Sequence, residues 1–273
     1  MAARLFSSAC VCLGLAFAQD PRSLVARAVA ADDHSDRLAR DYTYKVRDEI
    51  RELDGGRVRS THSTLDEVLY IGGKRYFRTL EKDGKPVSGG EAQKAQAKLD
   101  RAAAEASHMT EAERARRIAS EERDRAKFRM QFQAVPDAYD FRLLGETVID
   151  GRGTYEITAT PRPGYKGPLR TILRNLEGTL WIDKKDLIWV RFEADVLKPF
   201  FLGWLLARVG EGTHLSYEMM RVNDELWVPR GISLKASARM VLLKKVNVEQ
   251  TLTFSDYRKF SSDSRIISEG ETR

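Results

Sequence analysis

The stretches 232–242, ISLKASARMVL, and 246–254, VNVEQTLTF, decide the fold. In both, apolar residues recur at every second position, which is the pattern of a β-strand with one buried face. The alternating residues of the first stretch are Ile232, Leu234, Ala236, Ala238, Met240 and Leu242. Those of the second stretch are Val246, Val248, Leu252 and Phe254. The two stretches therefore predict a long antiparallel pair of strands.

The same two-residue rhythm extends over most of the chain. It predicts strands over the ranges 42–50, 58–71, 75–80, 139–143, 155–159, 178–183, 187–197, 213–222 and 226–228. Asp54-Gly55-Gly56, Asp83-Gly84, Asp150-Gly151 and Asn223-Asp224 supply turns between them. About ten antiparallel strands, each with one apolar face, predict a mainly β protein with helices (α+β). We expect a strongly curved antiparallel sheet that forms an open half-barrel covered by helices.

The range 88–127 has a helical rhythm instead. Its apolar stripe is mostly alanine, and Ser88 and Thr110 each stand three residues before a glutamate, Glu91 and Glu113, as in a capping box. Ser107-His108 is a weak point between the two pieces. Nine basic and eight acidic residues lie between Glu91 and Lys127. This range is interpreted as a solvated helical insertion, which we expect to tolerate shortening, rather than as a basic binding helix.

The first eighteen residues have the three-part order of a secretory signal. Arg4 precedes an apolar stretch, and Ala16-Phe17-Ala18 is a small-x-small triplet, so we expect cleavage after Ala18 and export to the periplasm. The apolar stretch is too short for a permanent membrane anchor. Cys10 and Cys12 are the only cysteines of the chain, so the mature protein is expected to have no disulfide and no thiolate metal site.

The sequence predicts one domain after the signal. Residues 19–38 are expected to form a lead helix and linker, 39–262 a single half-barrel domain with the insertion 88–127, and 263–273 a disordered tail. Loss of Arg4 lowers the formal net charge from +6 to +5. An excess this small, spread over a highly charged chain, argues against nucleic-acid binding and at most favours contact with an anionic membrane face.

The usual catalytic motifs are absent from the sequence. There is no G-x-S-x-G, no H-E-x-x-H and no phosphate-binding glycine loop, and the four histidines lie in unrelated segments. Asp183 and Asp186 flank a tight turn, where an aspartate side chain bonds the local backbone. We therefore expect no enzyme, no metal site and no cofactor, and a secreted hydrolase is the third-ranked hypothesis.

The segment 199–207, PFFLGWLLA, departs from the alternating pattern. It joins two predicted strands, where a polar loop is usual. Two interpretations remain open: a structural one, in which a short helix plugs one end of the sheet, and a functional one, in which the segment is an apolar lip at the mouth of a cavity or a patch that touches lipid. Stability and lipid retention of variants at Phe201 and Trp204 would separate the two.

Three short segments of the chain together resemble the LolA/LolB superfamily of periplasmic lipoprotein carriers, which includes the RseB sensor domain. They are the strand Leu176-Glu-Gly-Thr-Leu-Trp-Ile-Asp183, the strand Leu187-Ile-Trp-Val-Arg-Phe192 that follows it after a short turn, and the late Tyr257-Arg-Lys-Phe260. The resemblance covers roughly residues 40–260 as architecture. It implies an apolar cavity between sheet and helices that holds acyl chains without catalysis. The long charged insertion departs from that pattern.

The leading hypothesis is therefore an extracytoplasmic carrier that binds lipid or lipoprotein acyl chains, with contact to a membrane surface and no nucleic-acid partner. The runner-up is an envelope sensor or scaffold that docks a protein partner on its charged helices. Besides the inward faces of the last two strands, the residues expected to line the cavity or its lip are Trp181, Trp189, Val190, Phe192, Phe200, Phe201, Trp204 and Leu205. The alternation does not say which strand face is inward.

Overall fold

The computed structural model describes residues 20–31, 38–202, 207–240 and 245–259. One antiparallel sheet of thirteen strands dominates this part of the chain. The strands are β1 (Tyr42–Asp54), β2 (Arg57–Ile71), β3 (Lys74–Lys82), β4 (Lys85–Pro86), β5 (Tyr139–Ile149), β6 (Arg152–Pro161), β7 (Leu176–Asp183), β8 (Trp189–Val196), β9 (Phe200–Leu202), β10 (Ala207–Val209), β11 (His214–Val222), β12 (Leu226–Met240) and β13 (Lys245–Lys259). The helices are α1 (Pro21–Ala31), η1 (Ala39–Asp41), α3 (Gly89–Ser107), α4 (Glu111–Phe132), α5 (Val135–Ala138) and α6 (Arg170–Leu173).

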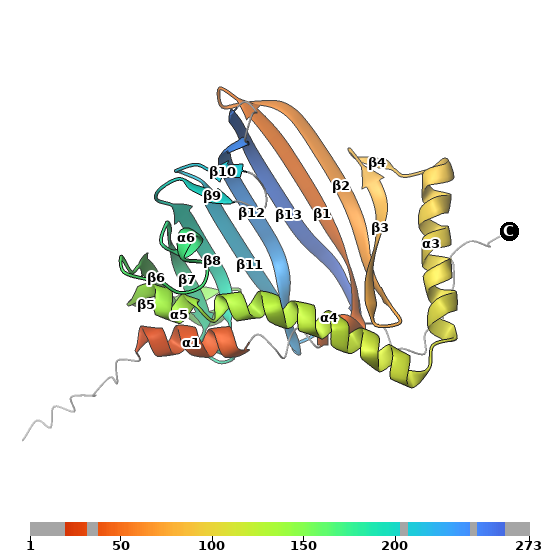
Figure 1. Cartoon of the computed structure of the whole chain (residues 1–273), viewed down its shortest axis with the longest axis horizontal. Coiled ribbons are helices and arrows are strands. Elements are labelled where there is room, and N and C mark those ends of the chain that lie inside the picture. Colours follow the sequence, from red (N-terminus) through yellow and green to blue (C-terminus); the bar gives the residue numbers. More distant parts are fainter. Residues whose placement is uncertain (1–19, 32–37, 203–206, 241–244, 260–273) are drawn as a thin grey trace, which may run out of the picture.

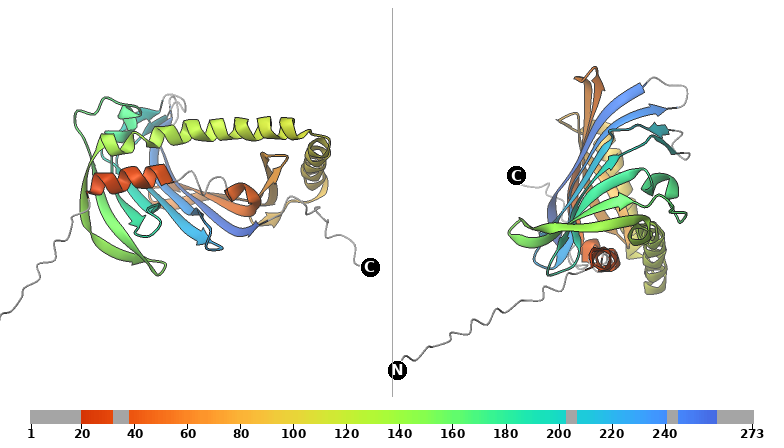
Figure 2. Two further views of the ribbon diagram at one scale, coloured as in Figure 1. Left: turned by 90° about the horizontal axis from the view of Figure 1, so that it is seen from below. Right: turned by 90° about the vertical axis from the view of Figure 1, so that its left-hand side faces the viewer.

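The sheet is curved but does not close on itself. Its order runs β4-β3-β2-β1-β13-β12-β11-β8-β7-β6-β5, so the first and last strands are not hydrogen-bonded to each other. Figure 2 shows the curved sheet to one side of α4, which runs from the β5 side of the molecule to α3. The predicted mainly β fold, an open half-barrel with helices, is confirmed.

Turn chemistry fixes the hairpins where the sequence places them. Asp150 and Gly151 both have positive φ, at 50° and 75°, and Asn223 and Asp224 do too, at 51° and 55°. Two consecutive residues of this kind match the right-handed twist of the flanking strands. The turns expected from Asp-Gly and Asn-Asp pairs are therefore confirmed.

The core is divided among small clusters under different helices. α1 packs Leu24, Val25 and Ala28 against Ile157 and Ile182 of the β6–β7 pair. A second cluster gathers Ala134, Ala138, Tyr139, Ala159 and Leu173 beneath α5 and α6. At the other edge, Leu99, Ala102 and Ala106 of α3 cover Ile71. In Figure 1, α1 and α4 lie along the same end of the sheet.

The helical insertion is longer than expected, since α4 continues to Phe132. Its break after Ser107 and the second capping box are as predicted: Glu113 accepts from the Thr110 backbone N–H at 2.8 Å, and Glu113 N–H donates to Thr110 Oγ1 at 3.3 Å. The first capping box is wrong. Ser88 makes no side-chain cap bond, and Glu91 instead pairs with Lys82 of β3.

The α3–α4 corner rests on the β2–β3 turn, which gives a first prediction. A Cβ on Gly73 (φ +80°) would lie 2.5 Å from Cγ1 of Ile118, whereas a Cβ on Gly56 (φ +82°), in the β1–β2 turn, would meet nothing within 4 Å. Gly56→Ala should cost roughly 1 kcal/mol of stability from backbone strain alone. Gly73→Ala should cost about 1 to 3 kcal/mol more, because Ile118 must move. Thermal unfolding of both variants checks this, and equal losses would contradict it.

Candidate functional site

One cross-strand row of residues runs over nearly the whole sheet. The register places, each directly opposite the next, Leu143, Ile157, Leu180, Phe192, Tyr217, Ile232, Leu252, Asp48, Thr64 and Lys82. Directly opposed residues of antiparallel strands share a face. The row is apolar or aromatic from β5 to β13 and polar from β1 to β3. We call the face that carries it the inner face, because α1 packs on it at Ile157.

Aromatic rings form a continuous group on the inner face at the middle of this row. Trp189 stacks on Phe192 with ring centroids 5.5 Å apart, and Phe192 stacks on Tyr217 at 5.3 Å. Phe132, the last residue of α4, meets Trp189 edge-on at 5.4 Å. Aromatic pairs in these geometries are favourable beyond the area they bury. The end of α4 is thereby held against β8.

The inner face is covered at its two edges and much less at its centre. Phe192, Ile232 and Leu252 are half-buried and belong to none of the five buried clusters of the described residues. The main helix contacts within the described chain are with β2, β3, β5, β7, β8 and β9, whereas the main contacts of β11, β12, β13 and β1 are with other strands. The central strands therefore present partly exposed apolar side chains to the space on the helix side.

The apolar part of the row ends at a polar group on β1. The side-chain amide of Gln250 donates to both carboxylate oxygens of Asp48 at 3.0 Å. Farther along, the Thr64 hydroxyl donates to Asp66 at 3.1 Å. The inner face is thus amphipathic along its width. It can accept an elongated apolar group over β8 to β13 and a polar group beside β1.

The structure brings together only some of the predicted site residues. Trp189 and Phe192 meet on the inner face, and Val190 is buried with Ile188 and Met219. Trp181 lies opposite Arg191, whose guanidinium stands 5.2 Å from the indole centroid, and its register places it on the outer face. Backbone alternation separates it from Phe192, because its neighbour Leu180 is the residue opposite Phe192.

The segment that begins at Pro199 forms strands where it is described. Phe200 is buried and Phe201 is 49% exposed, and β9 pairs with β10. The alternative of a short helix is therefore wrong for Phe200–Leu202. Trp204 and Leu205 lie outside the described residues, as does Ala18 at the expected cleavage site.

Two residues of the aromatic group were not among the predicted site residues. Tyr217 stands in a strand that the sequence does predict, and its alternation with Leu215 and Met219 was the signal available. Phe132 had no such signal, because the helical range was expected to end at Lys127 and its stripe to be alanine.

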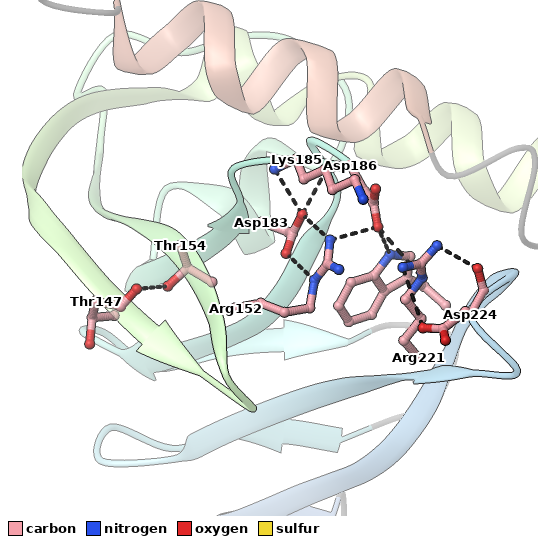
Figure 3. A network of polar contacts seen from close by, with 9 residues as sticks. Thr147, Arg152, Thr154, Asp183, Lys185, Asp186, Arg221 and Asp224 are labelled. Atoms are coloured by element: carbon pink, nitrogen blue, oxygen red, sulfur yellow. Dashed lines mark hydrogen bonds and ion pairs between the residues drawn. The ribbon is translucent and has the colours of Figure 1, made fainter.

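A second candidate site is the polar network at the end of β7, which Figure 3 shows. Arg152 donates from Nε to Asp183 Oδ2 at 2.6 Å and from Nη2 to Asp183 Oδ1 at 2.8 Å. The same Nη2 donates to Asp186 at 2.9 Å, and the Trp227 indole N–H donates to that carboxylate oxygen at 2.9 Å. The backbone N–H groups of Lys185 and Asp186 donate to Asp183 Oδ1, as the sequence predicts for this turn.

This network stabilises the fold. Asp183 is 1% exposed, and both of its oxygens accept hydrogen bonds from Arg152 or from backbone N–H groups. Burial alone would raise the pKa of Asp183, but the hydrogen bonds from Arg152 and the backbone bring that pKa below its ordinary value. Trp227 belongs to β12 and Arg152 to β6, which are not neighbours in the sheet. The network therefore holds the curvature of the half-barrel at this end.

Comparison with known proteins gives structural neighbours only. No family model and no curated protein matches the chain. A DUF1329 family protein from Desulfovibrio piger aligns over 90% of this chain and 95% of its own, with 13% identity and a TM-score of 0.33. A putative outer membrane lipoprotein-sorting protein domain from Vibrio parahaemolyticus aligns over 89% of this chain and 95% of its own, with 11% identity and a TM-score of 0.33.

A LolA superfamily protein from Nitrosomonas europaea covers 89% of this chain and 94% of its own, with 11% identity and a TM-score of 0.30. Two of these three structures are named for lipoprotein sorting or for the LolA superfamily.

Proposed function

We propose that this protein binds the acyl chain of a lipid or lipoprotein on its inner face, outside the cytoplasm and without catalysis. The observation that carries the proposal is the half-buried row Phe192, Tyr217, Ile232 and Leu252, in which all but Tyr217 lie outside every buried cluster of the described residues. Partly exposed apolar side chains gathered on one face commonly mark a ligand or interaction site.

The chemistry of the row selects a long apolar ligand. Burial of each CH₂ group contributes roughly 0.8 kcal/mol, so a chain lying across several strands gains enough to exceed the cost of immobilisation. The aromatic group Trp189, Phe192 and Tyr217 gives such a chain flat surfaces to lie on. Asp48 and Gln250, beyond Leu252, offer hydrogen bonds to the polar end of the ligand.

The proposed location outside the cytoplasm rests on the sequence. Residues 1–18 have the composition of an export signal, which supports the periplasm as the compartment that we propose for the mature protein. Within the described chain, no group of three or more His, Cys, Asp or Glu side chains could hold a metal ion, and no helix is long and apolar enough to cross a membrane.

A neighbouring pair of β13 residues tests the inner face directly. Leu252 lies on the inner face, whereas Thr251 is exposed on the other face of the same strand. We expect Leu252→Asp to weaken binding of a fluorescent fatty acid at least tenfold, because a carboxylate would have to be desolvated against the acyl chain. Thr251→Asp should leave binding unchanged. The measurement is a fluorescence titration of delipidated protein, alongside mass spectrometry of organic extracts from protein purified from the periplasm.

Two outcomes would contradict the proposal. One is the absence both of co-purified lipid and of fatty-acid binding by the wild type. The other is equal loss of binding in the Leu252 and Thr251 variants, since the inner face would then have no special role. Thermal unfolding of both variants must first show that they are folded.

A further inference from the structure

A single carboxylate stands among apolar side chains on the inner face of β1. Asp48 lies directly opposite Leu252 of β13 on one side and Thr64 of β2 on the other. Val46 and Ile50, two residues before and after it on the strand, share its face. All five side chains are half-buried. A ligand that lies along the apolar part of the row therefore meets this carboxylate at the next strand.

Asp48 has an amide partner but no cationic one. The side-chain amide of Gln250 donates to both of its oxygens at 3.0 Å. Among the described side chains, no Lys, Arg or His forms an ion pair with it. A carboxylate has about four sites at which it can accept a hydrogen bond. Lone pairs of Asp48 and the side-chain carbonyl oxygen of Gln250 are therefore left to accept hydrogen bonds from a ligand.

The basic residues of β1 all lie on the other face of the sheet, where each pairs with an acid. The pairs are Lys45 with Asp256 at 2.7 Å, Arg47 with Glu81 at 2.9 Å and Arg51 with Glu49 at 2.5 Å. In the row of Asp48 itself, Lys82 of β3 pairs with Glu91 of α3. The charge of Asp48 is therefore not balanced by the cations of its own strand or of its own row.

We propose that Asp48 selects the polar end of the ligand, and that it selects an ammonium group over a carboxylate or a phosphate. This inference rests on the proposed function, because the acyl chain on the apolar row is what brings the polar end of the ligand to β1. A positive charge beside a half-buried carboxylate is attracted and donates hydrogen bonds to it. An anionic group at the same place is repelled. The ligand class is therefore a long-chain lipid whose polar end bears a protonated amine.

The overall charge of the protein acts in the opposite direction. The chain has a formal net charge of +6. A positive protein attracts anionic ligands at long range. A preference for an ammonium group would therefore report the local charge at β1 and not the net charge of the molecule.

Three ligands with the same chain and different polar ends test the selection. Dodecylamine, dodecanol and dodecanoate are compared by their displacement of the neutral probe 1-N-phenylnaphthylamine from delipidated protein. At neutral pH the amine is protonated and the acid is ionised. We expect the wild type to bind dodecylamine at least about tenfold more tightly than dodecanoate, with dodecanol between them.

A neighbouring pair of β1 residues provides the variant and its control. Asp48→Asn keeps the shape of the side chain and an oxygen for the Gln250 amide, and it should bring the three affinities within about threefold of one another. Its unfolding temperature should be unchanged or higher, because a half-buried carboxylate without a cation is removed. Glu49→Gln removes the same charge from the other face of the strand, opposite Thr251, and should keep the order of the wild type.

The outcomes separate this inference from the proposed function. Equal binding of the three ligands by the wild type, or tighter binding of dodecanoate than of dodecylamine, would overturn the selection alone, since an alkyl chain would still bind. The same holds if Asp48→Asn kept the order of the wild type, or if Glu49→Gln lost it as well. If neither the probe nor any of the three ligands bound, dodecanol included, the proposed function would fail and this inference with it.

Discussion

Replacement of Asp183 by asparagine is expected to destabilise the protein by about 3 kcal/mol. Asparagine keeps the shape of the side chain and one oxygen for the backbone N–H groups of Lys185 and Asp186, but it removes the charge that Arg152 faces. Breaking a buried ion pair on one side costs about 3 to 5 kcal/mol, since the remaining charge loses its partner. Arg152 retains Asp186 at 2.9 Å, which favours the lower end of this range. Urea or thermal unfolding measures the loss.

Asp140→Asn is the matched control. Asp140 also pairs with an arginine of a neighbouring strand end, Arg162, at 2.7 Å, but its side chain is 67% exposed. Exposed ion pairs are worth about 0 to 1 kcal/mol. Equal losses in the two variants would show that the network of Figure 3 does not hold the half-barrel together.

The pH dependence follows from the lowered pKa of Asp183. A carboxyl whose pKa is lower in the folded than in the unfolded protein contributes stability above the unfolded pKa, and this contribution is lost as pH falls through the folded pKa. The unfolded value is about 3.9. The stability difference between wild type and Asp183→Asn should therefore stay constant near neutral pH and narrow below about pH 4. A difference that persisted undiminished in strong acid would contradict the charge-based explanation.

The sequence was sufficient to predict most strands because their cause is local. Alternation along Ile232 to Met240 and the positive-φ turn at Asp150-Gly151 depend only on neighbouring residues. Asp183 was correctly assigned to a turn that its side chain caps. Its partner Arg152 lies 31 residues away, and no local pattern announces that contact. The network was thus predictable at its turn and not across the sheet.

Assignment of residues to the two faces was the main gap. Trp181 and Phe192 were expected to line one cavity, but alternation in β7 and its register with β8 place them on opposite faces. A register is fixed by long-range pairing, which the sequence alone leaves open. Residues 19–38 were expected to form a lead helix and linker. The contact of Leu24, Val25 and Ala28 with the core is also a long-range one, which the local pattern does not announce.

Two isoleucines of the cross-strand row separate stability from ligand binding. Ile157 is fully buried beneath α1, whereas Ile232, on the same row and face, is half-buried outside the five buried clusters. Ile157→Ala should cost about 2 to 5 kcal/mol, because it leaves a cavity between β6 and α1. That corresponds to a fall in unfolding temperature of roughly 2 to 4 °C for each kcal/mol. Fatty-acid affinity should stay near the wild-type value.

Ile232→Ala removes the same atoms with a different expected result. The Ile232 side chain is only half-buried in the ligand-free fold, so the loss of stability should be roughly 1 kcal/mol. Its remaining apolar surface is free to contact an acyl chain, and affinity for a fluorescent fatty acid should fall about tenfold, the equivalent of roughly 1.4 kcal/mol. Thermal unfolding measures the stability of each variant, and fluorescence titration measures its affinity for the fatty acid. If Ile232→Ala destabilised the lipid-free protein as much as Ile157→Ala and left affinity unchanged, the centre of the inner face would be ordinary core and the proposed ligand site would be wrong.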